Sequence, residues 1–232
     1  MSKTLKVIVI VIILAAAGYL IYNQTRDNAP SDDDLEAMKE SIIADPVVNV
    51  TDLTEEQKIA ALERFQSAKK IVVDSNFDTL QGINDVAQIK RFLGDFEGAR
   101  VAWEYANIIR PQNSLSFSNV AALYHFDLKE YDKAEENYLI SIANDPDDLP
   151  TARNLFELYF YALKDNEKAE GVLLKSIEDN PEEADLYSLT ARFYDDTGNT
   201  QKAIEYYEKH LAINPDNEAV KMEVDRLRSS AN

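Results

Sequence analysis

The sequence of 232 residues contains no cysteine, which excludes disulfide bonds, a thiol nucleophile and a lipidated cysteine. It has only two histidines, His125 and His210, and we interpret His125 as a residue at the edge of the core. A metal centre or a histidine-activated nucleophile needs several converging groups. Six glycines leave no glycine-rich loop for a phosphate group. We therefore expect no catalytic residue, no cofactor and no metal, and thus no enzyme.

Positive charge is also scarce, because 24 lysines and arginines oppose 42 aspartates and glutamates and the formal net charge is −18. Lys3, Lys6 and Arg26 against Asp27 give residues 1–30 a charge of +2, so residues 31–232 carry −20. Such a domain repels nucleic acid and favours basic partners. We therefore exclude nucleic-acid binding, although acidity also serves solubility.

A repeat of 34 or 35 residues organises most of the chain. Each repeat has an alanine, a large apolar side chain four residues later, and a proline twelve residues after the alanine. The small and the bulky residue share one helical face, and the proline ends the helix. Self-similarity at this period predicts stacked helical hairpins that present binding surfaces. The alanines are Ala99, Ala134, Ala169 and Ala203, and the prolines are Pro111, Pro146, Pro181 and Pro215.

This pattern resembles the tetratricopeptide repeat (TPR), most clearly in residues 185–215, which end in GNTQKAIEYYEKHLAINP. The resemblance implies an all-α fold, a right-handed solenoid of helical hairpins within residues 80–232. Its four repeats would span 80–113, 114–148, 149–182 and 183–215, followed by a capping helix at 216–229. The small residue of each first helix is present as Ala87, Ala122 and Ala191, whereas the third repeat has Glu157.

Residues 31–79 precede the repeats and contain a linker and two expected helices. Ser31 is placed to cap a helix that runs to about Ala44. Thr54 and Gln57 form a capping box for a second helix, which reaches about residue 74. We expect these helices to cover the first repeat as an N-terminal lid, with an apolar stripe made of Ile59, Leu62, Phe65 and Val72.

Residues 1–30 contain the longest apolar stretch, from Val7 to Tyr22, behind Lys3 and Lys6. A helix over residues 5–22 would span about 27 Å, which just crosses a bilayer. We therefore predict a cytoplasmic stub, a transmembrane anchor at about residues 5–22 that contacts the lipid bilayer, and the start of a linker. The alternative is a signal peptide, residues 1–17, cleaved to give a secreted TPR protein.

The charges beside this stretch predict its orientation. Lys3 and Lys6 precede it and Arg26 alone follows closely, so the positive-inside rule leaves the N-terminus in the cytoplasm. The expected location is a single-pass membrane protein whose TPR domain is extracytoplasmic, in the periplasm or at the cell surface if bacterial. A eukaryotic outer-membrane anchor with cytosolic repeats is the alternative.

In TPR proteins the first helix of each pair lines a concave groove, so the resemblance implies binding residues there. Asn84, Asn119 and Asn154 recur 35 residues apart, and the fourth repeat has Ser188. A row of asparagines can both donate to and accept from a peptide backbone. The alternative is that these asparagines are only polar surface residues that recur because the repeat was duplicated. The same helix face adds Gln88, Phe92, Leu123, Phe126, Leu158, Tyr161 and Arg192.

These residues predict a groove for protein or peptide partners, with apolar or basic segments favoured. The lysine and arginine clamp with which some TPR domains hold an acidic C-terminal tail is missing. We expect a membrane-tethered interaction module or adaptor that binds its partners on the extracytoplasmic side. The alternative is a structural scaffold that self-associates and binds no peptide.

Overall fold

The computed structural model describes residues 30–230, which form helices joined by short turns. These residues divide into two compact units, residues 30–145 and residues 146–230. We call them the N-terminal unit and the C-terminal unit and describe each by itself. The division falls inside the range 80–232 that the sequence suggests as one repeat domain, at the proline that ends the second repeat.

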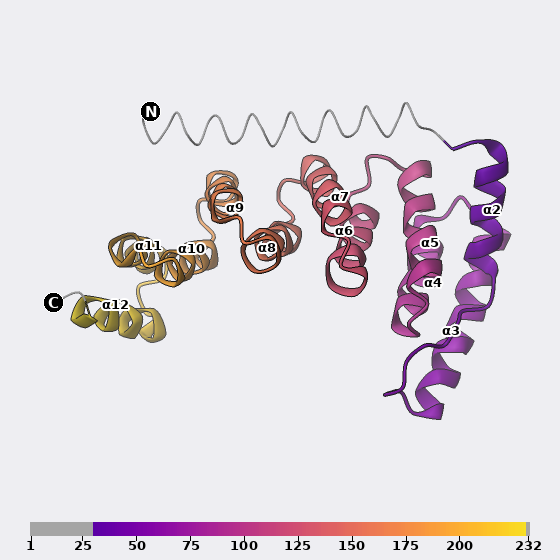
Figure 1. Cartoon of the computed structure of the whole chain (residues 1–232), viewed down its shortest axis with the longest axis horizontal. Coiled ribbons are helices and arrows are strands. Elements are labelled where there is room, and N and C mark those ends of the chain that lie inside the picture. Colours follow the sequence, from indigo (N-terminus) through magenta and orange to yellow (C-terminus); the bar gives the residue numbers. More distant parts are fainter. Residues whose placement is uncertain (1–29, 231–232) are drawn as a thin grey trace. The chain divides into compact units, whose positions relative to one another are not determined.

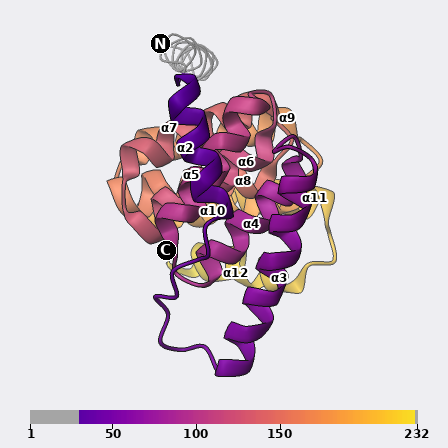
Figure 2. The ribbon, with the colours of Figure 1, turned by 90° about the vertical axis from the view of Figure 1, so that its right-hand side faces the viewer.

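The N-terminal unit holds two helical hairpins, α4 with α5 and α6 with α7, and the two expected lid helices (Figure 1). Figure 2 shows α2 lying along α5, and α3 packs against α4. Both lid helices therefore cover the first repeat, one on each of its helices. The elements are α2 (Asp32–Ile43), α3 (Glu55–Asp74), α4 (Leu80–Phe92), α5 (Phe96–Ile109), α6 (Ser114–Ala122), the π-helical turn η1 (Leu123–Leu128) and α7 (Tyr131–Asn144).

The C-terminal unit also consists of paired helices, with α8 against α9 and α10 against α11. Helix α12 packs on α11, and its residues Val220, Val224 and Leu227 are buried. The elements are α8 (Leu149–Glu157), the π-helical turn η2 (Leu158–Leu163), α9 (Asn166–Asp179), α10 (Ala184–Asp196), α11 (Thr200–Ile213) and α12 (Glu218–Ser230).

Helix boundaries follow the local signals in the sequence. Thr54 forms the predicted capping box, since its hydroxyl accepts from the backbone of Gln57 and the Gln57 side chain accepts from the backbone of Thr54. Ser31 caps α2 in the same way with Asp34. Helices α5, α7, α9 and α11 each end two residues before a proline, as predicted. The predicted stripe of α3 is right for Phe65 and Val72, but Ile59 is 56% exposed.

From the N-cap of the first helix to the N-cap of the second helix, the second and third repeats are one residue longer than the first and fourth. The backbone N–H of Glu130 bonds to the oxygen of Tyr124, six residues back. In the first repeat the corresponding N–H, of Asp95, bonds to Lys90, five residues back. The π-helical turns η1 and η2 accommodate the extra residue, as π-bulges do. The repeats therefore keep their spacing in sequence, but residues at equal spacing in the first helices do not occupy equivalent structural positions.

This change of register corrects the assignment of the small residues. Ala87 and Ala191 are completely buried at the hairpin interface, as expected. In the second repeat the completely buried alanine is Ala121, and Ala122 is half-buried. In the third repeat the buried residue is Phe156, whereas Glu157 is half-buried and therefore causes no packing conflict.

The predicted membrane span at residues 5–22 and the alternative signal peptide lie outside the described residues. Among residues 30–230, no helix is both long enough and apolar enough to cross a membrane. The longest described helix, α3, has 20 residues, but charged side chains interrupt it throughout. For residues 30–230, the prediction of a single-pass membrane protein with an extracytoplasmic TPR domain is therefore wrong.

Lys90 of α4 is a buried cation on which several helices of the N-terminal unit converge. Its Nζ donates to the backbone oxygen of Ala44, at the end of α2, and to Oδ2 of Asp95, both at 3.0 Å. Asp95 also caps α5, because its Oδ1 accepts from the N–H of Gly98 at 3.0 Å. The ring of Phe65 from α3 lies 5.5 Å from Nζ. This ammonium group thus links both lid helices to the first repeat, in addition to their packing on α4 and α5.

His125 of η1 is buried, with 6% of its surface exposed. Its ring stacks on that of Phe126, with 4.0 Å between centroids, and meets the rings of Tyr131 and Tyr138 edge-on. Nδ1 lies 3.5 Å from the Tyr138 hydroxyl, at the limit of a hydrogen bond. Burial, and after it the positive charge of Lys129, lowers the pKa of His125 below its ordinary value.

Replacing Lys90 by methionine is expected to lower the free energy of unfolding by about 3 kcal/mol. The reason is that the change leaves the carboxylate of Asp95 and the oxygen of Ala44 buried without their donor. Urea unfolding of the full chain measures the loss. Lys70→Met is the matched control, because Lys70 is exposed and its ion pair with Asp74 lies on the surface. Equal stability of Lys90→Met and the control would contradict the role given to Lys90.

His125 is expected to make the fold acid-sensitive. The folded state favours the neutral ring, so the unfolded chain binds the proton more readily. Stability is then complete above the ordinary histidine pKa of about 6.5 and falls below it, by at most about 1.4 kcal/mol per pH unit. Urea unfolding from about pH 8 to pH 5 should show His125→Phe losing less stability than the wild type. A difference that does not change with pH would refute this assignment.

Candidate functional site

The exposed aromatic residues of the first helices share one structural position. Phe92, Phe126 and Tyr161 are 49%, 39% and 56% exposed, and the register of the π-helical turns makes them equivalent. We call them the aromatic positions. The fourth repeat has Asp196 in this place. Large exposed aromatic side chains at a repeated position are typical of a surface that binds a partner.

Phe92 and Phe126 belong to neighbouring repeats of the N-terminal unit. Arg91 and Asp127, their neighbours in the chain, form an ion pair in which Nε and Nη2 lie 2.7 and 2.6 Å from Oδ2 of the carboxylate. This pair joins the end of α4 to η1. Asp127 is the extra residue of the second repeat, so the π-helical turn supplies the carboxylate that links η1 to the end of α4.

Two of the predicted binding residues lie in the core. Leu123 and Leu158 have no exposed surface, because each is the first residue of a π-helical turn and points into the hairpin. They have nothing to offer a ligand in this structure, and they correspond to Ile89, which is also buried. Sequence spacing alone could not separate them from Phe126 and Tyr161, three residues further on.

The asparagines do not form the row that their spacing suggests. In the corrected register, Asn84 is equivalent to Ser118, Arg153 and Ser188, whereas Asn119 and Asn154 stand one position further along. Asn84 is also buried. Its Oδ1 accepts from the indole N–H of Trp103 at 3.0 Å and from Nδ2 of Asn119 at 2.8 Å. Its acceptor is therefore used inside the fold, and only its donor is left for a ligand.

The remaining predicted residues differ in surroundings. Gln88 and Arg192 are exposed at equivalent positions of α4 and α10, and Asn119 and Asn154 are half-buried. Ser188 lies 2.8 Å from Nδ1 of His210, which also lies 2.8 Å from the oxygen of Ala184. Because a carbonyl only accepts, Nδ1 of His210 carries the proton. Its hydrogen bond to Ala184 joins α11 to α10.

A pocket that the sequence did not indicate lies beside Asn84. It has a volume of about 260 Å³ and is bordered by α4, α5 and α6. The signal that could have found it is Trp103, the single tryptophan of the chain, since a buried indole N–H needs an acceptor. The lining residues are Leu80, Gln81, Asn84, Ala106, Asn113, Leu115 and Ser116.

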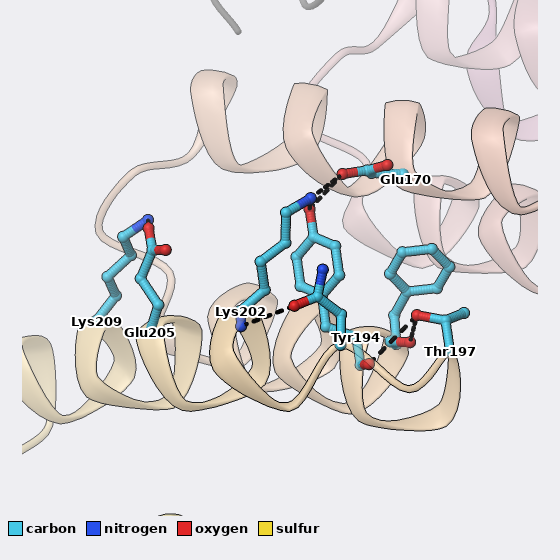
Figure 3. Close-up of polar contacts among 8 residues, drawn as sticks. Glu170, Tyr194, Thr197, Lys202, Glu205 and Lys209 are labelled. Atoms are coloured by element: carbon cyan, nitrogen blue, oxygen red, sulfur yellow. Dashed lines mark hydrogen bonds and ion pairs between the residues drawn. The ribbon is translucent and has the colours of Figure 1, made fainter. Parts of the chain in front are cut away.

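A polar cluster in the C-terminal unit joins α9, α10 and α11 (Figure 3). The hydroxyl of Tyr194 donates to Oε1 of Glu170 at 2.5 Å, and Nζ of Lys202 lies 2.8 Å from the same oxygen. The ammonium group of Lys202 also lies 4.2 Å from the centre of the Tyr194 ring. Burial, and then the Glu170 carboxylate, raises the pKa of Tyr194 strongly, so its hydroxyl stays protonated. The cluster therefore holds helices together and contains no activated nucleophile.

The described residues offer no arrangement for metal chemistry. Within residues 30–230, no group of three or more histidine, aspartate or glutamate side chains is placed to hold a metal ion. His125 and His210 each contact neighbouring helices of their own unit. The geometry instead presents binding surfaces: the aromatic positions and the pocket beside Asn84.

Comparison with known proteins supports the repeat. Residues 158–218 match the family model described as tetratricopeptide repeat. No curated protein matches the sequence. Among solved structures, MamA superposes with a TM-score of 0.50 at 25% identity, covering 62% of this chain and 84% of MamA.

Two further solved structures share the fold at lower identity. BtubC (BKLC) from P. vanneervenii has a TM-score of 0.57 at 20% identity and covers 76% of this chain and 84% of its own. YrrB, described as a TPR protein with an unusual peptide-binding site, has a TM-score of 0.54 at 11% identity over 72% of this chain and 84% of YrrB. Together with the helical hairpins, these matches support a TPR protein with an all-α solenoid fold.

Proposed function

We propose that this chain is a protein-interaction module that binds peptide segments of partner proteins on the first helices of its repeats. The observation that carries the proposal is the exposed aromatic residue at one repeated position, Phe92, Phe126 and Tyr161. The fold of a TPR protein supports it, and the similar protein YrrB is described as having a peptide-binding site. The aromatic positions, rather than the asparagine spacing, are the basis of this function.

The charges of the N-terminal unit favour a basic and apolar partner. Residues 30–145 contain 22 acidic and 11 basic side chains, a net charge of −11. Next to Phe92 in the chain, the guanidinium of Arg91 is already paired with Asp127, and α4 also carries Asp85. A peptide with lysine or arginine next to apolar side chains meets complementary charge here. Because Arg153 and Arg192 are exposed on α8 and α10, we restrict this preference to the N-terminal unit.

Aromatic contact area would supply most of the affinity. A few buried aromatic side chains dominate the binding energy of most interfaces, and rim charges mainly set the association rate and its dependence on salt. Phe92 and Phe126 are therefore the expected anchors in the N-terminal unit. The backbone contribution is smaller than an asparagine row would give, because the Asn84 acceptor is occupied.

The double variant Phe92→Ala, Phe126→Ala is expected to bind at least tenfold more weakly, because it removes both aromatic contacts. Binders are first selected from a library of random peptides displayed against the full chain. Dissociation constants are then measured by fluorescence anisotropy for the wild type and the variant. Circular dichroism checks that the variant stays folded, since both side chains are exposed.

Met222→Ala is the matched control, because Met222 is an exposed apolar residue, 71% accessible, on the capping helix α12. It should bind the selected peptides as the wild type does. Selected peptides should also carry net positive charge and bind more weakly as salt rises. If no peptide is enriched, or if the double variant and the control bind equally, the proposal fails.

A further inference from the structure

The pocket beside Asn84 has uncharged walls and is small. Its volume of about 260 Å³ is below the roughly 300–1,000 Å³ of pockets that enclose a small-molecule ligand. Leu80, Ala106 and Leu115 supply its apolar surface, and all of its polar lining residues are neutral. With no cation in the lining, the pocket does not suit a phosphate or a carboxylate. A neutral group with an aliphatic part fits it better.

The orientation of the Asn84 amide is set by the fold. The indole N–H of Trp103 can only donate, so the atom that faces it at 3.0 Å must be the Asn84 oxygen. Nδ2 of Asn119 donates to the same oxygen at 2.8 Å. The amide cannot turn over without placing its NH₂ group against two donors. Asn84 therefore presents a fixed donor, and a ligand here must offer an acceptor.

The Nδ2 group of Asn84 is available to such a ligand. It makes no hydrogen bond within residues 30–230, and it is not sealed from solvent. The neighbouring polar groups are already partly engaged. The Asn113 oxygen caps α6 by accepting from the N–H and the hydroxyl of Ser116, and Nε2 of Gln81 donates to Asp85.

We propose that this pocket binds one aliphatic side chain of a peptide, while Nδ2 of Asn84 donates to a backbone carbonyl oxygen of the same peptide. The inference deepens the proposed function and rests on it. An extended peptide carries a carbonyl one residue from each side chain, so apolar anchor and acceptor come together. A lipid chain has the apolar part but needs a longer cavity, and a free anion has no partner here.

Trp103 reports directly on this pocket, because it is the single tryptophan of the chain and its indole N–H bonds to Asn84. The probe is N-acetyl-leucinamide, which has one aliphatic side chain between two carbonyl groups. N-acetyl-glycinamide, which lacks the side chain, is the matched probe. In ¹⁵N NMR titrations of the full chain, the leucine probe should shift the indole resonance saturably. The glycine probe should leave it almost unchanged.

Two variants test the hydrogen-bond donor and the apolar wall of the pocket separately. Asn84→Asp keeps an acceptor for Trp103 and Asn119 but has no donor, so the leucine probe should bind at least fivefold more weakly. Leu115→Ala removes apolar wall from an exposed position, 51% accessible, and should weaken binding to a similar degree. Asn154→Asp is the matched control, since it makes the same chemical change at a residue that is not part of the pocket lining and should leave affinity unchanged.

The outcomes distinguish this inference from the proposed function. Equal response to both probes, or unchanged affinity of Asn84→Asp with an intact indole resonance, would overturn the pocket assignment. Selected peptides that depend on Phe92 and Phe126 but not on Asn84 or Leu115 would do the same and leave the proposed function standing. Weaker binding of both the probe and the peptides by Asn84→Asp and Leu115→Ala is the expected result.

Discussion

The close approach of two helices at a completely buried alanine is the contact on which each hairpin depends. Ala99, Ala134, Ala169 and Ala203 have no exposed surface, and each follows the turn of its hairpin by five residues. A larger side chain there would push the second helix away from the first, since protein interiors are close-packed. With that contact in place, the positions that face outwards on each first helix are determined.

The sequence was sufficient for the hairpins and their ends, because alanine spacing, capping residues and prolines act locally. It was not sufficient for the register of the second and third repeats. Counting back from the turn gives Ala122, Asn119 and Asn154, but η1 and η2 add a residue between the turn and these positions. Counting forward from the preceding proline avoids the error, since Tyr124 and Tyr194 both follow theirs by thirteen residues and are both buried.

The candidate site was predictable in the same uneven way. The aromatic positions were among the residues predicted for the groove, but spacing alone could not distinguish Phe126 and Tyr161 from the buried leucines three residues before them, because residues i and i+3 share a helix face. The state of Asn84 could not be predicted, because it depends on Trp103 from the second helix and on Asn119 from the next repeat. A residue type fixes which hydrogen bonds are possible, and only the tertiary contacts decide which of them remain for a ligand.

The π-helical turn of the second repeat shows how a local feature of the sequence changes the tertiary contacts. An extra residue in a helix interrupts the regular ladder of backbone hydrogen bonds and shifts the position of every side chain after it. Here the shift is absorbed within one turn, and the extra residue, Asp127, pairs with Arg91 of the preceding repeat. Phe126 consequently keeps the outward position of Phe92, and the Arg91–Asp127 ion pair joins the ends of their two helices. In the function proposed above, the exposed rings supply the apolar contact, and the negative net charge of the N-terminal unit favours a positively charged partner.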